Sequence, residues 1–250
     1  MKSDLIVRAP SGMSGDMMVT GLAKVGNFSE RCLNEMIAQI GVRELCGAIK
    51  IRKAFVNGIT GWRASVKLKP EHHHRSFKDI QKIIARSRLS LRAKRYAQTA
   101  FRLLAKAEGA IHRVHPDEVT FHEIGGLDSI LDVCLAAALF DALSPARFFC
   151  SPLPLCDGNI PCAHGVLPSP APAALYLLKD VPVYGIDSKG ETVTPTAISL
   201  LKAFGAKFGP WPKVSLKNII RAYGSRVLPN VPNGAVFALG DSLRQKKVVK

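Results

Sequence analysis

The sequence predicts a mixed α/β protein, and three observations point to this class. A short apolar run, Leu5–Ala9, reads as a buried strand and precedes a helix pattern. Two β-rich runs meet at Asn57-Gly58, the preferred residue pair for a two-residue hairpin. Amphipathic helix patterns then fill much of residues 77–143. Strands and helices in this arrangement bury their apolar faces against one another in layers.

Residues 1–70 read as a small α+β domain with a ferredoxin-like sandwich. Ser29 is a suitable N-cap for its second helix, and Gly41 a suitable stop. The predicted elements are a strand at Leu5–Ala9, a loop at Pro10–Gly15, helices at Asp16–Val25 and Ser29–Ile40, and hairpin strands at Ile49–Val56 and Ile59–Leu68.

Residues 71–240 are predicted to form a helical, loop-rich α+β segment with short strands, and residues 241–250 a basic tail. Its elements are helices at Phe77–Arg88, Leu91–His112 and Asp128–Leu143, a strand at Phe148–Cys150, and a helix opened by Thr194 as cap and Pro195. Ser151–Pro172 is rich in Pro and Gly, so no regular structure is expected there. A loop of that length inside a domain usually has a function.

Composition is that of a globular protein, with 250 residues, 47% hydrophobic and 22% charged. The apolar stretch Val133–Phe140 is too short to span a membrane, and the N-terminus carries no secretory pattern. The six cysteines lack paired spacing, which favours a reducing compartment. We therefore expect a cytoplasmic protein without a membrane partner.

The net charge of +16 is distributed unevenly along the chain. Residues 75–113 carry +9 and residues 202–250 carry +9, whereas residues 114–201 between them carry −7. Acidic side chains suit a cation, and basic flanks suit phosphates or carboxylates. A solvated basic surface is the plainer alternative for either basic segment.

The turn Ser11-Gly-Met-Ser-Gly-Asp16 lies between a predicted strand and a predicted helix. The backbone amides of Ser11, Gly12, Ser14 and Gly15, with the helix start, could hold a phosphate or carboxylate. Asp16 repels an anion, so we place it on a metal ion that bridges it to the ligand. The alternative is a tight turn that needs glycine, with Asp16 as a helix-end charge.

A second constellation begins at His122-Glu123 and continues to Asp128 and Asp132. Imidazole and carboxylates beside a glycine-containing helix start can bind a divalent ion. Asp128 and Asp132 lie four residues apart and share one helix face. Alternatively, Asp128 caps the helix and Asp132 is a structural acceptor, which would need a partner if buried.

The segment from Cys156 to Gly165 adds two thiols, Asp157 and His164. Cys162 and His164 are ligand types that nickel or zinc accepts, although the spacing matches no closed zinc site. His72-His73-His74 could also bind metal, but a solvated loop before a helix explains it equally.

Taken together, these motifs resemble the nickel insertion proteins of nickel-pincer-nucleotide cofactor synthesis (the LarC family). The matching segments, in the order expected for the family, are Ser11–Met17, His74–Asp79, Phe121–Asp132, Ser151–Leu155, Cys162–Gly165, Pro168–Pro172 and Thr194–Thr196. Arg8 departs from the pattern, because family members usually carry Asp there.

The resemblance implies insertion of nickel into pyridinium-3,5-bisthiocarboxylate mononucleotide by a lyase-class nickel chelatase, driven by CTP with Mg or Mn. From their residue types, the candidate metal ligands are Asp16, His122, Asp128, Asp132, Cys162 and His164. A base near the pyridinium carbon would be His122 or Glu123. Arg75 and Lys78 would pair with the substrate phosphate, with Thr194 and Thr196 at the same ligand site.

Longer family members continue into a further domain, so the chain resembles an N-terminal component that works with a C-terminal-half protein. A homo-oligomer is a further possibility. Two other readings stay open, namely a metal-binding scaffold without turnover and a basic nucleic-acid-binding protein. The second lacks an aromatic stacking set, with only 7% aromatic residues, so no nucleic-acid partner is expected.

Overall fold

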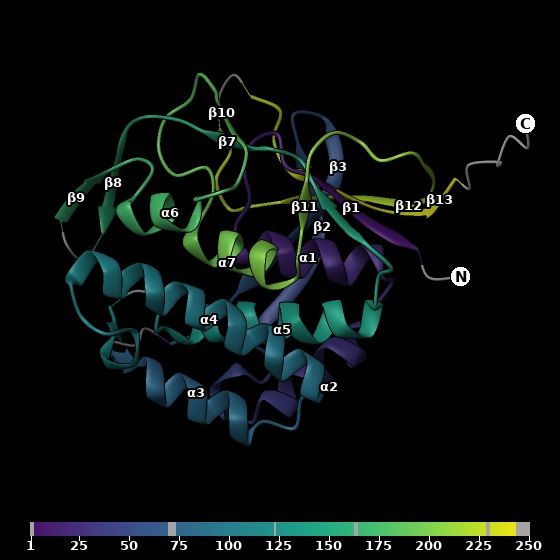
Figure 1. Ribbon diagram of the computed structural model, residues 1–250. Helices are drawn as coiled ribbons and strands as arrows, with labels where there is room; N and C mark the ends of the chain where they lie inside the picture. The colour runs from purple at the N-terminus through teal and green to yellow at the C-terminus, as the bar shows by residue number, and fades with distance from the viewer. Residues whose placement is uncertain (1–2, 70–73, 123, 163–164, 229–230, 244–250) are drawn as a thin grey trace, which may run out of the picture.

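The computed structural model describes residues 3–69, 74–122, 124–162, 165–228 and 231–243. At its centre is a seven-stranded sheet with strand order β11-β6-β1-β13-β12-β3-β2. The strands are β1 (Asp4–Arg8), β2 (Ile49–Val56), β3 (Ile59–Val66), β6 (Phe148–Cys150), β11 (Lys207–Phe208), β12 (Val214–Tyr223) and β13 (Ala235–Ser242). Helices pack below this sheet in the view of Figure 1. The predicted mixed α/β class is confirmed.

The helices follow the predicted pattern closely, apart from the short helix Pro172–Leu177, which was not predicted. They are α1 (Gly15–Val25), α2 (Glu30–Ile40), α3 (Phe77–Arg86), α4 (Leu91–His112), α5 (Leu127–Leu143), α6 (Pro172–Leu177) and α7 (Pro195–Ala203), with short 3-10 turns at Arg43–Leu45 and Pro116–Glu118. Ser29 caps α2 by accepting a hydrogen bond from the Cys32 amide at 3.2 Å, and Gly41 ends it with a φ of 82°. The apolar helix α5 is buried between α1 and α4.

The hairpin β2–β3 turns at Asn57 and Gly58, whose φ angles are 51° and 75°. Positive φ at both positions is what a two-residue turn of this type requires. The strands of residues 1–70 pair in the same sheet as β6, β11, β12 and β13. The two predicted domains therefore share one sheet, and residue 70 does not separate two cores.

Ser151–Pro172 contains regular structure, which corrects the prediction for this segment. β7 (Leu153–Leu155) pairs with β10 (Val183–Gly185), and β8 (Asn159–Cys162) pairs with β9 (Gly165–Pro168). Proline is tolerated because these ladders have only two strands, so a missing amide can face away from the partner. A further two-stranded ladder joins β4 (Arg75–Ser76) to β5 (Thr120–Phe121).

The directions of the strands indicate at which edge of the sheet a ligand site should lie. β6 runs parallel to β1, and β13 runs antiparallel to both β1 and β12. Since β3 runs parallel to β12, the strands β1, β3, β6 and β12 all end at the same edge of the sheet. In open α/β sheets, ligands bind outside the carboxyl ends of such strands.

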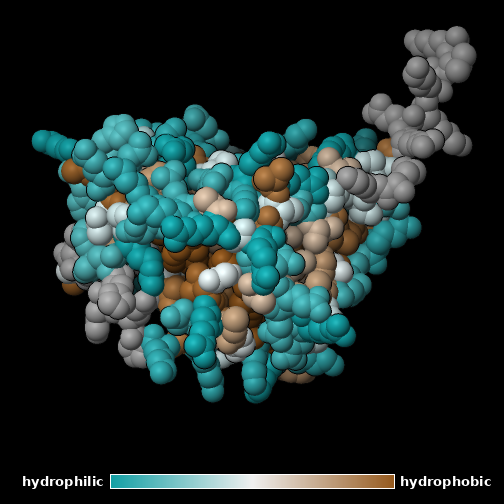
Figure 2. Space-filling view, turned by 90° about the horizontal axis from the view of Figure 1, so that it is seen from below, coloured by the Kyte–Doolittle hydropathy of each residue, from teal (hydrophilic) through white to brown (hydrophobic). Residues whose placement is uncertain are grey.

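Figure 2 shows the face of the molecule that lies at the bottom of Figure 1, on the side of α2 and α3. On this face, hydrophilic side chains surround a hydrophobic hollow. Much of the basic charge of residues 75–113 lies exposed on α3 and α4, at Lys78, Lys82, Arg86, Arg92, Arg95, Arg102 and Lys106. In the described part of the chain, no helix combines the length and apolarity needed to cross a membrane.

Candidate functional site

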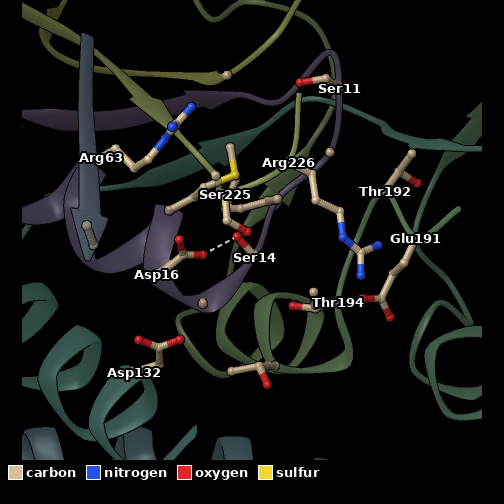
Figure 3. Close-up of a pocket in the computed structure, with 18 of the residues that line it drawn as sticks. Ser11, Ser14, Asp16, Arg63, Asp132, Glu191, Thr192, Thr194, Ser225 and Arg226 are labelled. Carbon is tan, nitrogen blue, oxygen red and sulfur yellow. Dashed lines mark hydrogen bonds between the residues drawn. The ribbon is translucent and has the colours of Figure 1, made fainter. Parts of the chain in front are cut away.

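A cavity of about 680 Å³, here called the first cavity, lies at the carboxyl edge of the sheet. Its wall combines the turn Ser11–Met17 after β1, the end of β3 at Arg63–Val66, and the segment Gly224–Arg226 after β12. The segment from Glu191 to Thr196 and the start of α5 complete it. Figure 3 shows these side chains pointing into one space from segments far apart in the sequence.

Three helices begin at the first cavity. α1 contributes Gly15 and Asp16, α5 contributes Asp128 and Ser129, and the cap of α7 contributes Thr194. Each helix start carries a partial positive charge of about half a unit and presents unpaired amides. Their convergence makes the cavity favourable for anions and also eases the accumulation of carboxylates there.

The turn between β1 and α1 is pinned to the Glu191–Thr196 segment by backbone contacts. The Met13 amide donates to the Thr192 carbonyl at 2.9 Å, and the Thr194 amide donates to the Met13 carbonyl at 3.1 Å. Gly12 has a φ of 98°, and a Cβ there would lie 1.8 Å from the Thr192 oxygen. Glycine is therefore required at position 12 for both conformation and space.

Gly15 is required for a different reason, which involves α5. A Cβ at Gly15 would lie 2.4 Å from Oδ2 of Asp132. The bare backbone at the start of α1 thus lets the Asp132 carboxyl approach the helix terminus. In Figure 3, this carboxyl points toward Asp16, which forms a short hydrogen bond with the hydroxyl of Ser14.

The surroundings of the Asp16 and Asp132 carboxyl groups in the first cavity disfavour their charged forms. Burial raises the pKa of Asp132 well above its usual value, and the charges of Asp16 and Asp128 raise it further. Burial also raises the pKa of Asp16, whereas hydrogen bonds from Ser14 and from the backbone lower it. Both groups hold a negative charge only at a cost that a bound cation would remove.

Two shielded atoms of opposite charge lack partners in this cavity. Nε of Arg63 and Oδ1 of Asp132 are inaccessible to water and have no hydrogen-bond partner within the described chain. Leaving such groups unpaired costs about 1–3 kcal/mol each, and more when they are charged. Unpaired buried groups of this kind are uncommon unless a ligand satisfies them.

A second cavity of about 380 Å³ adjoins the first, because Glu191 and Arg226 line both. Its wall is largely apolar, with Ile111, Phe121, Ile124, Ile160 and Leu167. Its other polar side chains are Glu108, His112 and His122. The His122 ring lies 5.0 Å from that of His74 and 6.1 Å from that of His112, measured between centroids.

The structure brings most of the predicted site residues together, in two groups. The first cavity collects Ser11, Gly12, Ser14, Gly15, Asp16, Asp128, Asp132, Thr194 and Thr196, whereas His122 lines the second. Cys162 ends β8, and Glu123 and His164 lie outside the described residues. Within the described chain, no three His, Cys, Asp or Glu residues are grouped so as to hold a metal ion.

Arg75 and Lys78 line neither cavity. A guanidinium nitrogen of Arg75 donates to the Gly125 carbonyl at 3.0 Å, and Lys78 is exposed on α3. Arg8 also turns away, donating to the Gly209 carbonyl at 2.7 Å and lying over the ring of Trp211. The cations that do reach the first cavity are Arg63 and Arg226, so the basic helices are not the source of its positive side chains.

Other residues that line the first cavity were not among the predicted site residues, namely Arg63, Glu191, Ser225, Arg226 and Asn233. Arg63 sits in an ordinary strand, and no motif marks it. A partial signal existed for Arg226, because Gly224-Ser225 follows a β-rich run much as Gly12 and Gly15 follow β1.

A family model described as nickel insertion protein matches residues 5–249. A protein of Desulfitobacterium hafniense is 36% identical over 92% of this chain and 57% of its own length. One of Geobacillus kaustophilus is 35% identical, over 94% and 59%. One of Staphylococcus epidermidis is 31% identical, over 93% and 58%.

These three relatives share one name, pyridinium-3,5-bisthiocarboxylic acid mononucleotide nickel insertion protein. The chain spans less than three fifths of the length of each. No solved structure shows a significant match. The family match covers nearly the whole chain, including every segment that lines the two cavities. The chain therefore belongs to the nickel insertion protein family.

Proposed function

We propose that the chain binds pyridinium-3,5-bisthiocarboxylic acid mononucleotide and takes part in inserting nickel into it, as the names of its relatives indicate for them. One observation carries the proposal. Shielded, unpartnered atoms of opposite charge, Nε of Arg63 and Oδ1 of Asp132, line the same cavity. A ligand that combines a phosphate with a divalent cation would place a negative charge beside the Arg63 guanidinium and a positive charge beside the Asp132 carboxyl.

The phosphate binds at the turn Ser11–Gly15 in this proposal. The starts of α1 and α7 meet there, and amides at helix starts bind phosphate oxygens. Arg63 adds the side-chain charge that was expected from Arg75 and Lys78. Thr194 and Thr196 are close enough to the same space to offer hydroxyl groups.

A divalent cation that bridges the Asp16 and Asp132 carboxylates to the bound phosphate would complete the first cavity, with phosphate oxygens and water as the remaining donors and Asp128 adding negative charge nearby. Carboxylate oxygens are the donors that Mg²⁺ and Mn²⁺ prefer. The raised pKa of Asp132 and of Asp16 fits a group of carboxylates that a cation stabilises. When bound, such an ion neutralises phosphate charge beside the carboxylates.

Nickel, the metal to be inserted, is assigned to a set of ligands that includes His122. Imidazole and thiolate ligands suit nickel better than carboxylates alone, and His122, Cys162 and His164 are the proposed set. His122 or Glu123 takes the proton when the ring carbon exchanges its bond to hydrogen for a bond to nickel. The CTP step, with its Mg or Mn, is assigned to the part of the family's length that this chain does not span, on the same polypeptide or a separate one.

Calorimetry with Mn²⁺ and nicotinate mononucleotide, a pyridinium mononucleotide with one ring carboxylate, tests the first cavity. Asp132→Asn should weaken Mn²⁺-dependent binding of the nucleotide tenfold or more, about 1.4 kcal/mol. Asp187→Asn is the matched control, because Asp187 is exposed and lines neither cavity. Equal affinities in the two variants would overturn the proposed cation site.

A nickel titration tests the other assignment. His122→Ala and His164→Ala should each weaken Ni²⁺ binding about tenfold or more, whereas His115→Ala should not, because His115 is exposed and lines neither cavity. Unchanged affinity in both variants would reduce these histidines to structural residues. The isolated 250 residues should not hydrolyse CTP at a significant rate, and robust turnover would contradict the division of labour.

A further inference from the structure

The two cavities adjoin each other, so a ligand that occupied both would cross their junction. Glu191 and Arg226 line both, and Figure 3 shows the two side chains facing each other at the edge of the first cavity. The volumes, about 680 and 380 Å³, fall in the usual range for small-molecule sites. A ligand longer than either cavity would therefore pass Arg226.

The two cavities differ in the chemistry they accept. The first offers helix starts, hydroxyl groups and carboxylates, which suit a doubly charged phosphate and a cation. The second is walled by apolar side chains such as Phe121, Ile124 and Leu167, which suit a flat and weakly hydrated ring. Glu108 and Glu191 add negative charge to its wall, which favours a positively charged ring, and His112 and His122 are its imidazole groups.

We infer that the substrate lies across both cavities, with its phosphate in the first and its pyridinium ring in the second, and that Arg226 at the junction pairs with an anionic ring substituent. This inference rests on the proposed function and adds the orientation of the ligand and a specificity-determining residue. The Arg226 guanidinium can donate two parallel hydrogen bonds to a carboxylate or thiocarboxylate. Glu191, which faces it, is the positioning residue that holds the guanidinium at the junction.

The orientation also brings the ring beside the residues assigned to nickel. His122 lines the second cavity and not the first. A ring held there presents its substituents to His122, while the phosphate stays with Arg63 and the Ser11–Gly15 turn. The opposite orientation would place the phosphate against an apolar wall, where removing it from water costs far more than removing a ring.

Three probes separate the two ends of the ligand. Nicotinate mononucleotide has both charges, nicotinamide mononucleotide lacks the ring carboxylate, and nicotinate riboside lacks the phosphate. The wild-type chain with Mn²⁺ should bind the first probe about tenfold more tightly than either of the others. Arg226→Gln should abolish the preference for the carboxylate and retain the preference for the phosphate. Arg63→Gln should do the reverse.

Matched controls guard against a general loss of charge or structure. Arg95→Gln removes an exposed arginine on α4 that lines neither cavity, and it should leave both preferences intact. Leu167→Glu places a negative charge in the second cavity and should weaken nicotinate mononucleotide more than nicotinamide mononucleotide. Val166→Glu changes the neighbouring exposed position, outside both cavities, and should affect the two equally.

The outcomes distinguish two failures. If neither mononucleotide binds the wild-type chain, the proposed function fails and the inference fails with it. If mononucleotides bind and Asp132→Asn weakens them, but Arg226→Gln leaves the carboxylate preference unchanged, only the inference is overturned. Exchange of the two arginine phenotypes would reverse the orientation and would also overturn it.

Discussion

A buried aspartate lies near each end of β1, and the two have opposite surroundings. At its start, Asp4 is 1% exposed, and Arg147 donates to its two oxygens at 3.0 and 2.5 Å. The hydroxyl of Ser242 donates to the same carboxyl at 2.8 Å. Beyond its end, Asp132 packs against Gly15 with one oxygen shielded and unpartnered. One end is a satisfied hydrogen-bond network, whereas the other leaves a buried carboxyl oxygen without a partner among the described residues.

The electrostatics of the two groups follow from this difference. The Arg147 hydrogen bonds hold the pKa of Asp4 below its usual value, whereas burial and two neighbouring carboxylates raise that of Asp132. A protein tolerates an unsatisfied acid when function requires it there. The contrast indicates that stability is concentrated at the start of β1 and that binding capacity is concentrated at its end.

The largest effect is expected at the start of β1. Asp4→Asn should destabilise the chain by about 3 kcal/mol, the lower end of the cost of breaking a buried ion pair, because Arg147 is partly exposed. Chemical denaturation would measure this change. Binding of nicotinate mononucleotide at temperatures where the variant stays folded should be unchanged. A loss of binding equal to that of Asp132→Asn would erase the distinction between the two ends.

Gly15→Val comes next, because its side chain would collide with Asp132. Overpacking should cost about 1–3 kcal/mol, and binding in the first cavity should be lost. Gly185→Ala is the control, since a Cβ there meets nothing within 4 Å. Combining Gly15→Val with Asp132→Ala should destabilise less than the sum of the two single changes, because the colliding carboxyl is gone. Strict additivity would show that the close approach does not matter.

Asp132→Asn should stabilise the chain in the absence of divalent cations, by about 1 kcal/mol, since it removes an unpaired charge. Thermal melting would show a rise of about 2–4 °C. Adding Mn²⁺ should raise the melting temperature of the wild type and have little effect on the variant. A variant that melts below the cation-free wild type would mean that Asp132 is a structural acceptor.

The contributions of Asp132 and Asp4 to stability should change with pH in opposite directions. This is the smallest of the expected effects. Because the pKa of Asp132 is raised on folding, its contribution is most favourable at low pH and is lost as pH rises from 3.8 through its folded value. The contribution of Asp4 is lost as pH falls below 3.8. Melting curves of each Asn variant against wild type should therefore diverge in opposite pH ranges. Parallel pH profiles would contradict this assignment.

Local rules in the sequence predicted the elements that local chemistry controls. The cap at Ser29, the turn at Asn57-Gly58 and the cap at Thr194 all appear as expected. The strands β12 and β13 were not predicted, because their pairing depends on partners far away in the chain. The β7–β9 segment was mistaken for irregular structure because proline was weighed without knowing that its ladders have two strands.

The residues of the candidate site also differ in whether local sequence or long-range pairing places them there. Gly12, Gly15 and Asp16 could be named as candidates because a strand, a turn and a helix lie consecutively in the sequence. Arg63 and Arg226 were missed because only the order β13-β12-β3 brings their strand ends to the cavity. Arg75 and Lys78 were placed at the phosphate by charge alone, and the fold directs both elsewhere.

The position of β13 in the sheet has a consequence for biosynthesis. Asp4 pairs with Gly240 and Arg8 with Val236, so the first strand receives this neighbour only after synthesis has passed residues 236–240. At about 5–20 residues per second, β1 waits on the order of ten seconds or more on the ribosome with that edge unpaired. A nascent chain stopped before Ala235 would leave β1 and β12 each with an open edge, where strands of other chains can add.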